Sequence, residues 1–204
     1  MAEQQNAAVL VVDLGGAGPG ELEQALIRNG LDIVETLTGP RGLVKQVTEC
    51  RPGLVVMNSR SLEPELIEPI RALNQYFPTP LILFAQQAES ERIEEAVRAG
   101  AHACVVDSPD PARLRPIIDA ARVRFQELQA LHRELENTRA RLADRQVIDR
   151  AKALLIQHRN MDEEEAYHAM RKLAMNKSRR LADVADDIIA ALERNAPEEH
   201  RFGA

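Results

Sequence analysis

The 204-residue sequence predicts a five-stranded parallel α/β sheet, followed by a long helix and a small all-helical domain. Three observations lead to this prediction. Short β-branched runs alternate with helical patterns over residues 7–107, a helical stretch without glycine runs from residue 109 to about residue 159, and further apolar helix faces follow up to residue 194. Strands that alternate with helical patterns indicate a parallel sheet with crossover helices.

Five apolar runs are predicted to form the strands. They occupy residues 9–12, 32–34, 54–57, 81–84 and 103–106. Continuous apolar runs are typical of parallel strands that are buried on both faces. Helical stretches separate them, near residues 19–29, 40–51, 64–75 and 89–99. Gly30 and Gly100 follow two of these stretches, at positions where helices commonly end.

The long helical stretch carries a line of leucines. Its members follow one another at alternating intervals of three and four residues: Leu128, Leu131, Leu135, Thr138 and Leu142. This spacing predicts a parallel homodimeric coiled coil with one polar layer at Thr138. The alternative is a single amphipathic helix packed on its own domain, which usually has a wider apolar stripe.

The C-terminal part is predicted to close one small three-helix core. The apolar faces carry Val147, Ile148, Ala151, Leu154 and Leu155 on a first helix, Ala166, Met170 and Leu173 on a second, and Leu181, Val184, Ala185, Ile188 and Ile189 on a third. We therefore expect four segments. These are a sheet domain at residues 1–122, a linker helix at 118–146, an all-helical domain at 143–194 and a flexible tail at 195–204.

Composition favours a cytoplasmic protein without a membrane segment. No stretch approaches the run of about 18 apolar residues that a membrane span needs, and the N-terminus lacks the pattern of a signal peptide. Cys50 and Cys104 are too few and too far apart for a zinc site. The histidines are scattered and no catalytic constellation is present, so we expect a regulator without metal or cofactor, and not an enzyme.

A basic segment stands out in this acidic chain. The net charge is −6, yet residues 171–180 contain five basic residues and no acidic one. A local patch suits a selective contact better than general binding to phosphates. Cations can meet phosphates, a tyrosine can stack on a base and an asparagine can pair with a base edge. The candidate RNA contacts are Lys152, Tyr167, Arg171, Lys172, Asn176, Lys177, Arg179 and Arg180. The alternative is a solvated run near a helix end.

The sheet domain resembles the receiver domain of bacterial response regulators, which have a flavodoxin-like fold. Phosphorylation of a receiver needs two acidic residues for Mg²⁺, an acceptor aspartate, a hydroxyl and a lysine at the strand ends. The matching positions hold Asp13 followed by Leu14, then Asn58, Ala85 and Asp107. An Asn58 amide cannot accept a phosphoryl group. We therefore expect a pseudo-receiver that is switched by a partner protein and not by phosphate.

The C-terminal domain resembles the ANTAR domain in four successive segments. These read AKALL at residues 151–155, EAY at 165–167, MRKLAM at 170–175 and LADVADDII at 181–189. The resemblance implies binding to paired small hairpins in a leader transcript, which prevents a terminator from forming. A homodimer would present two such domains, one for each hairpin.

The whole architecture resembles the nitrate-responsive antiterminators of the NasT type, with the amide-responsive AmiR type as the alternative. Both types are held inactive by a sensor that resembles periplasmic binding proteins, so the resemblance implies such a partner. Two further alternatives are a DNA-binding response regulator and a structural adaptor. Against DNA binding, the polar face of residues 181–192 is acidic, and the major groove would repel it.

Overall fold

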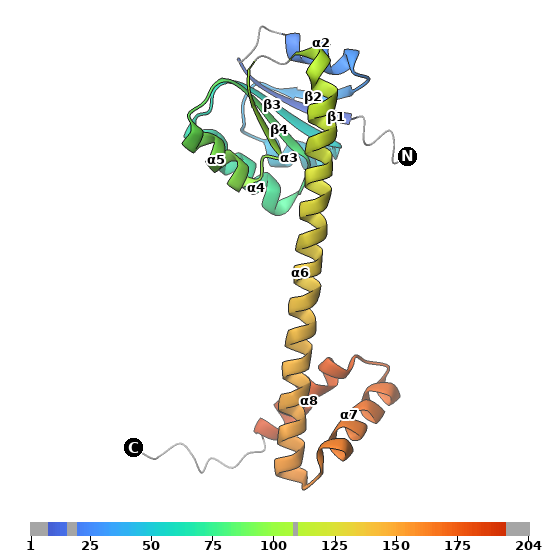
Figure 1. Cartoon of the computed structure of the whole chain (residues 1–204). Helices are drawn as coiled ribbons and strands as arrows, with labels where there is room; N and C mark the ends of the chain where they lie inside the picture. Colours follow the sequence, from blue (N-terminus) through green and yellow to red (C-terminus); the bar gives the residue numbers. More distant parts are fainter. Residues whose placement is uncertain (1–7, 16–19, 108–109, 195–204) are drawn as a thin grey trace, which may run out of the picture. The chain divides into compact units, whose positions relative to one another are not determined.

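The computed structural model describes residues 8–15, 20–107 and 110–194 (Figure 1). It divides into two compact units, Met1–Ala130 and Leu131–Ala204. Helix α6 (Pro111–Arg159) contributes residues to both units. The predicted tail at residues 195–204 lies outside the described residues.

The first unit contains the predicted five-stranded parallel sheet. Its strands are β1 (Ala8–Leu14), β2 (Asp32–Leu37), β3 (Leu54–Ser61), β4 (Leu81–Gln87) and β5 (Ala103–Val106). They lie in the order β2-β1-β3-β4-β5, and each neighbouring pair is parallel. This order makes the gap between β1 and β3 the point where the strand order reverses, which is where ligand sites form in such sheets. The predicted fold class is confirmed.

Helices cover both faces of this sheet (Figure 1). They are α2 (Glu21–Arg28), α3 (Leu43–Cys50), the short 3-10 helix η1 (Pro64–Leu66), α4 (Ile67–Tyr76), α5 (Ser90–Ala99) and the beginning of α6. Alternate residues of each strand point to opposite faces. Leu10 and Val12 pack in a cluster with α3, α4 and α5, whereas Val9 and Val11 pack in a second cluster with α2 and α6.

Some predicted element ends differ from the observed ones. Strand β3 continues four residues beyond residue 57, because Asn58 and Ser59 remain paired with β1 and β4. Helix α3 begins at Leu43 and not near residue 40, since Gly42 adopts a left-handed conformation with a φ of 81° immediately before it. Polar strand residues and a glycine turn thus account for these differences.

The second unit packs the end of α6 against α7 (Glu163–Lys177) and α8 (Leu181–Arg194). The predicted three-helix core is confirmed. Ala151, Met170 and Ala185, one from each helix, are fully buried at its centre. Partly buried neighbours surround them: Val147, Ile148, Leu155, Leu181, Ile188 and Ile189. Across the described part of the chain, no helix combines the length and apolar character needed to cross a membrane.

Both ends of α7 are defined by local structure. Asp162 accepts a hydrogen bond of 2.8 Å from the Glu165 backbone N–H, and the Glu165 carboxylate accepts one of 3.1 Å from the Asp162 N–H. This reciprocal capping box satisfies amides that the first helical turn leaves unpaired. Ser178 ends the helix in a left-handed conformation with a φ of 50°. The turn that follows leads directly into α8.

Candidate nucleic-acid interface

Helix α7 presents a mixed polar and apolar face to solvent. Five of the sequence-predicted RNA contacts belong to this helix, and all are exposed: Tyr167, Arg171, Lys172, Asn176 and Lys177. Residues three and four apart share one side of a helix. The side chains of His168, Arg171, Lys172, Met175 and Asn176 line a shallow hollow of about 270 Å³ on this helix. We call these residues together with Tyr167 the α7 face.

The sequence reasoning missed two members of the α7 face. Met175 lies four residues after Arg171 and is 72% exposed, and His168 lies four residues before Lys172. Helical spacing from the predicted cations could have identified both. Met175 and the partly exposed Tyr167 provide apolar surface on the same helix as the cations.

The cations of the α7 face are available for a ligand. Arg171 and Lys172 form no ion pair with any residue that the structure describes. No carboxylate of the described residues therefore neutralises their charge, and a phosphate can approach them without displacing any of these groups. Tyr167 lies on the same helix and is 40% exposed.

The remaining predicted contacts are already paired within the protein. In the turn before α8, the Arg179 guanidinium donates a hydrogen bond of 2.5 Å to the Asp187 carboxylate. Arg180 pairs with Asp144 of α6. The first pair is local and joins the turn to α8, whereas the second joins the turn to α6, 36 residues earlier. These two arginines thus differ from Arg171 and Lys172 of α7, which have no ion pair among the described residues.

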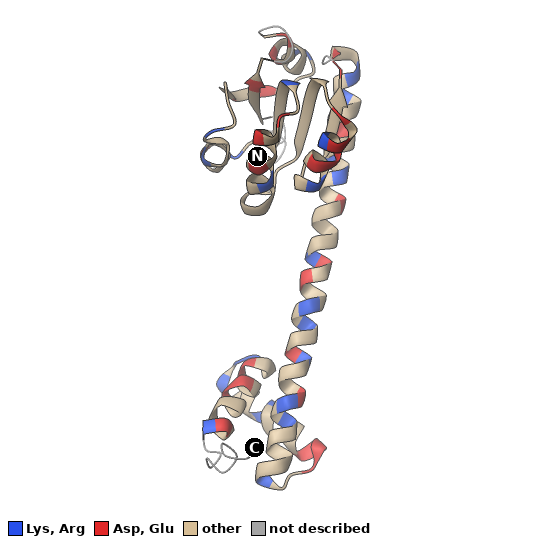
Figure 2. Cartoon of the chain, turned by 90° about the vertical axis from the view of Figure 1, so that its left-hand side faces the viewer, with Lys and Arg blue, Asp and Glu red and all other residues tan. Residues whose placement is uncertain are grey.

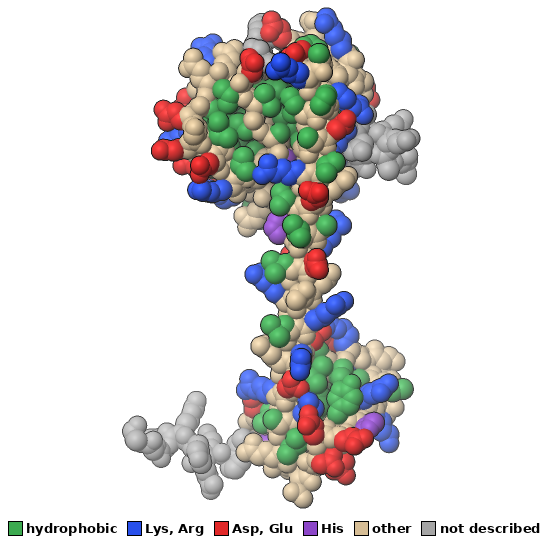
Figure 3. Space-filling model, viewed as in Figure 1, with side chains coloured by type: hydrophobic (Ala, Val, Ile, Leu, Met, Phe, Trp, Pro, Cys, Tyr) green, Lys and Arg blue, Asp and Glu red, His purple; other side chains and the backbone are tan. Residues whose placement is uncertain are grey.

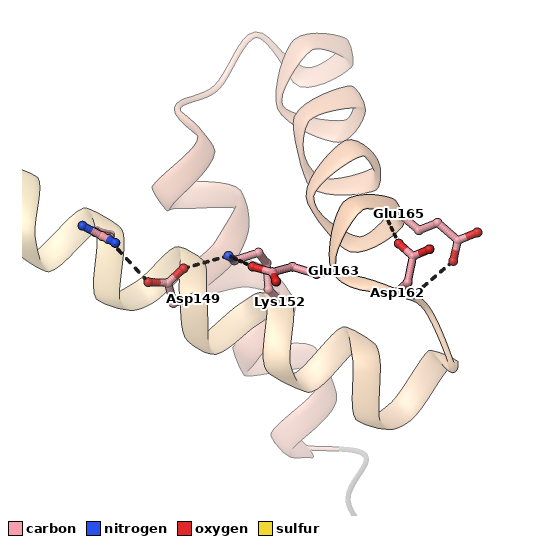
Figure 4. A network of polar contacts seen from close by, with 6 residues as sticks. Asp149, Lys152, Asp162, Glu163 and Glu165 are labelled. Carbon is pink, nitrogen blue, oxygen red and sulfur yellow. Dashed lines mark hydrogen bonds and ion pairs between the residues drawn. The ribbon is translucent and has the colours of Figure 1, made fainter.

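Lys152 lies at the centre of a network of ion pairs (Figure 4). Its Nζ is 2.9 Å from the Asp149 carboxylate and 2.8 Å from the Glu163 carboxylate. Arg145 approaches Asp149 at 3.8 Å. The Lys152 side chain is only 18% exposed. Hydrogen bonds to Glu163 and Asp149 raise the pKa of Lys152, and the bond to Lys152 lowers the pKa of Asp149. We call these four residues the Lys152 network.

The residues that were predicted to form a degenerate phosphorylation pocket lie at or near the carboxyl ends of the strands. The register places Asp13 of β1 beside Asn58 of β3, and the Asn58 amide donates a hydrogen bond of 3.1 Å to the Asp13 carboxylate. The Gly15 N–H donates to the same carboxylate oxygen, also at 3.1 Å. Ala85 is buried within β4, two residues before its end, whereas Asp107 is exposed after β5.

This pocket does not fit the magnesium ion that phosphorylation of a receiver requires. Mg²⁺ prefers several oxygen ligands, including carboxylates. Here Asp13 supplies one carboxylate, and amide hydrogens already occupy one of its oxygens. Within the described ranges, no group of three or more His, Cys, Asp or Glu side chains could hold a metal ion. Asp13 and its two amide partners therefore do not match the oxygen ligands that Mg²⁺ prefers.

The predicted coiled-coil line is exposed on α6. Leu128, Leu131, Leu135 and Leu142 are each between 40% and 62% exposed, and Thr138 is exposed as well. Figure 3 shows hydrophobic side chains spaced along this helix, and Figure 2 shows acidic and basic residues interspersed along it. A row of exposed leucines between charged residues is typical of a helix that pairs with another helix.

Comparison with solved structures supports the receiver fold. The signal receiver domain of a modulated diguanylate cyclase from Desulfovibrio desulfuricans aligns with a TM-score of 0.51, over 58% of this chain and 95% of that chain. A pilus assembly-related protein from Burkholderia pseudomallei aligns with a TM-score of 0.53, over 59% and 92% of the two chains. Both are 17% identical in sequence, so the likeness concerns the fold alone.

Comparison with curated proteins finds regulators. The transcriptional regulatory protein PdtaR of Mycobacterium tuberculosis is 26% identical over 172 residues, which is 84% of either chain. The nitrate regulatory protein of Klebsiella oxytoca is 33% identical over 87 residues, 42% of this chain and 22% of that protein. The aliphatic amidase regulator of Pseudomonas aeruginosa is 24% identical over 111 residues, 54% of this chain and 57% of that protein.

The C-terminal helices match a known domain family directly. Residues 136–189 match the ANTAR domain, and this range includes the whole α7 face and the whole Lys152 network. The match agrees with the resemblance found in the sequence of α6, α7 and α8. The chain therefore carries an ANTAR domain, preceded by a domain with the receiver fold.

Proposed function

We propose that this chain is an RNA-binding regulator of transcription antitermination. It binds paired hairpins in a leader transcript, and a sensor protein controls it in place of phosphorylation. The observation that carries the proposal is the α7 face, where Arg171 and Lys172 stand without carboxylate partners among the described residues. This face lies within the ANTAR match and in a chain of net charge −6.

The chemistry of the α7 face suits the loop of an RNA hairpin. Bases in such loops are unstacked, so aromatic and apolar side chains can pack against them while cations hold the phosphates. Tyr167 and Met175 offer the apolar contacts, Asn176 offers donors and an acceptor for a base edge, and Arg171 and Lys172 offer the charge. The acidic surface of α8, with Asp186 and Asp187 exposed, disfavours insertion into the major groove of DNA.

Binding to this kind of RNA is tested with a library of two-hairpin RNAs with randomised loops. We expect the full chain to enrich a subset of the library and to bind it in filter assays far more tightly than duplex DNA of the same sequence. Equal affinity for the RNA and the DNA, or no enrichment, would contradict the proposal.

The role of the α7 face is tested by Arg171→Ala. We expect RNA affinity to fall by about 1–3 kcal/mol, because Arg171 contacts a phosphate or stacks on a base. Arg28→Ala, an exposed arginine in the receiver unit, is the matched control and should leave the affinity unchanged. Circular dichroism of both variants excludes unfolding as the cause of any loss. A normal affinity for Arg171→Ala would place the contact elsewhere.

The proposal includes a homodimer held by the leucine line of α6. A second copy would bury the exposed leucines and present two ANTAR domains to two hairpins. Replacing Leu131 and Leu135 with alanine should shift the protein to monomers in sedimentation equilibrium, because the seam loses two apolar layers. His132→Ala, on the same helix but outside the line, should leave the dimer intact. A wild-type protein that is monomeric at micromolar concentration would refute this part of the proposal.

The signal proposed for this regulator is nitrate or nitrite, transmitted by a sensor that resembles periplasmic binding proteins. The K. oxytoca relative named as a nitrate regulatory protein supports this choice. The relative named as an aliphatic amidase regulator supports an amide signal as the second candidate. Co-purification of the chain with candidate sensors, with and without nitrate or short amides, separates the two.

A further inference from the structure

Lys152 differs from the other lysines that were predicted to contact RNA. Its ammonium group lies between two carboxylates at 2.9 Å and 2.8 Å, and its side chain is 18% exposed. Lys172, by contrast, is exposed and has no ion pair with a described residue. The two lysines thus offer a direct comparison within one domain.

The ion pair between Lys152 and Glu163 joins two helices. Lys152 lies on α6, and Glu163 is the first residue of α7, next to the capping box of Asp162 and Glu165 (Figure 4). The capping box fixes the first turn of α7 internally, and the ion pair attaches that turn to α6. Because a helix moves as one body, a contact at its first turn also sets the direction of the α7 face.

The same geometry argues against a contact between Lys152 and RNA. A phosphate that approached Lys152 would also approach the carboxylates of Asp149 and Glu163, which repel it. The Lys152 network contains two cations and two carboxylates, so it offers no net positive charge to a nucleic acid. Arg171 and Lys172 of the α7 face have no carboxylate partner among the described residues, so a phosphate that approaches them meets no such repulsion.

We infer that Lys152 is a positioning residue: by pairing with Asp149 and Glu163 it holds the first turn of α7 on α6, and it does not contact the RNA. This inference rests on the proposed function, since it concerns how the ANTAR domain presents the α7 face. It reassigns one of the residues that the sequence placed among the RNA contacts.

The first test compares the salt dependence of RNA binding by the full-length Lys152→Met and Lys172→Met variants. Both substitutions remove one positive charge. Loss of a phosphate contact reduces the slope of log affinity against log salt by about 0.7 to 1, which we expect for Lys172→Met. For Lys152→Met we expect an unchanged slope with a roughly two- to fivefold weaker affinity, in line with the loss of a modest ion pair. Equal falls in slope for the two variants would overturn the inference.

The second test exchanges the two charges. In Lys152→Glu with Glu163→Lys, the cation moves to α7 and can still meet carboxylates on α6. We expect this double variant to recover RNA affinity and thermal stability relative to Lys152→Glu alone. Lys172→Glu combined with Glu163→Lys is the control and should show no recovery. A swapped protein that folds but stays as weak as Lys152→Glu, or that fails to fold, contradicts the inference.

The two tests remain separate from the test of the proposed function. If the wild-type chain binds no hairpin RNA, the proposed function fails, whatever the thermal stability of the charge-exchange variants shows. If the wild-type chain binds and the charge exchange gives no recovery, the proposed function stands and only the assignment of Lys152 fails. Should Lys152→Met unfold the domain, the charge exchange still decides the assignment.

Discussion

In the receiver unit, strand β1 alone buries four consecutive apolar residues completely, at positions 9–12, whereas the core cluster of the ANTAR domain buries three residues, of which two are alanines. Burial of apolar surface contributes about 25 cal/mol per Å², so alanines add little. In the ANTAR domain, ion pairs also join the helices, between Lys152 and Glu163 and between Arg150 and Glu193. Exposed ion pairs typically contribute between about 0.2 and 1 kcal/mol.

The difference shows that the two units depend on different forces. The sheet is stabilised by apolar burial on both of its faces, and the three helices are stabilised by a small core, caps and charges. We therefore expect separate unfolding transitions, with the ANTAR domain unfolding first. The sequence contains two tyrosines and no tryptophan, with Tyr76 on α4 and Tyr167 on α7. Fluorotyrosine labelling and ¹⁹F NMR can thus follow each unit by its own signal.

The largest expected effect is in the receiver unit. Phe84 is 1% exposed and lies among the buried residues that face α2 and α6. Phe84→Ala leaves a cavity there and should lower the free energy of unfolding of this unit by about 3–5 kcal/mol. Urea titration should move the Tyr76 transition and leave the Tyr167 transition in place. An equal shift of both signals would show that the two units unfold as one, and would break the comparison.

A smaller effect is expected from acid, and it also concerns the receiver unit. The buried His102 ring accepts a hydrogen bond of 3.2 Å from the Leu81 N–H and packs edge-on against Phe125. Burial, with a contribution from Arg124, lowers the pKa of His102 from 6.5 to about 4. The folded state therefore keeps His102 neutral, while the unfolded state takes up a proton as the pH falls below 6.5.

This difference makes the stability of the receiver unit depend on pH. The contribution of His102 is complete above pH 6.5 and is lost as the pH falls towards 4, up to a total of about 3 kcal/mol. His102→Gln retains an acceptor for Leu81 but does not titrate in this range. We expect the Tyr76 transition of the wild type to decline more steeply than that of His102→Gln between pH 6.5 and pH 4. If the stability of the wild type and of His102→Gln declines equally over this pH range, groups other than His102 determine the pH dependence of the receiver unit.

The smallest effect is expected at the N-terminus of α7. Asp162→Ala removes the side chain that caps the Glu165 amide, which should cost the ANTAR domain about 1 kcal/mol. Asp186→Ala, an exposed acid within α8, is the matched control and should change stability by less than about 0.5 kcal/mol. Urea titration followed at the Tyr167 signal measures the stability of the ANTAR domain in both variants. If Asp162→Ala lowers the free energy of unfolding no more than Asp186→Ala does, tertiary contacts alone hold the first turn of α7.

Periodicity was sufficient to predict the layers of both units. Alternating apolar strands and helical stretches predicted the sheet, and apolar positions three and four apart predicted the helices of the ANTAR domain. The end of β3 was missed because Asn58 and Ser59 are polar, although neighbouring strands bury both. A buried polar residue inside a strand looks the same in sequence as a residue after its end.

The site was harder to predict, because the sequence does not show which charges meet. Residue type and helical spacing found Tyr167, Arg171 and Lys172 on α7. They could not show that Arg180 pairs with Asp144, 36 residues earlier, or that Lys152 pairs with Glu163. Such pairs form only when packing brings separate helices together. A basic residue in a sequence is therefore a candidate contact until its carboxylate neighbours are known.

The hydrogen bond between Asn58 and Asp13 has a consequence for the duration of a signal. A phosphorylated aspartate keeps a receiver switched on after its kinase has left, until the acyl phosphate hydrolyses. The Asn58 amide, which is hydrogen-bonded to Asp13, cannot form an acyl phosphate of this kind. Under the proposed control by a partner protein, a signal through this domain would last only as long as the partner remains bound. The dissociation rate of that partner would then set how quickly the proposed regulation ends.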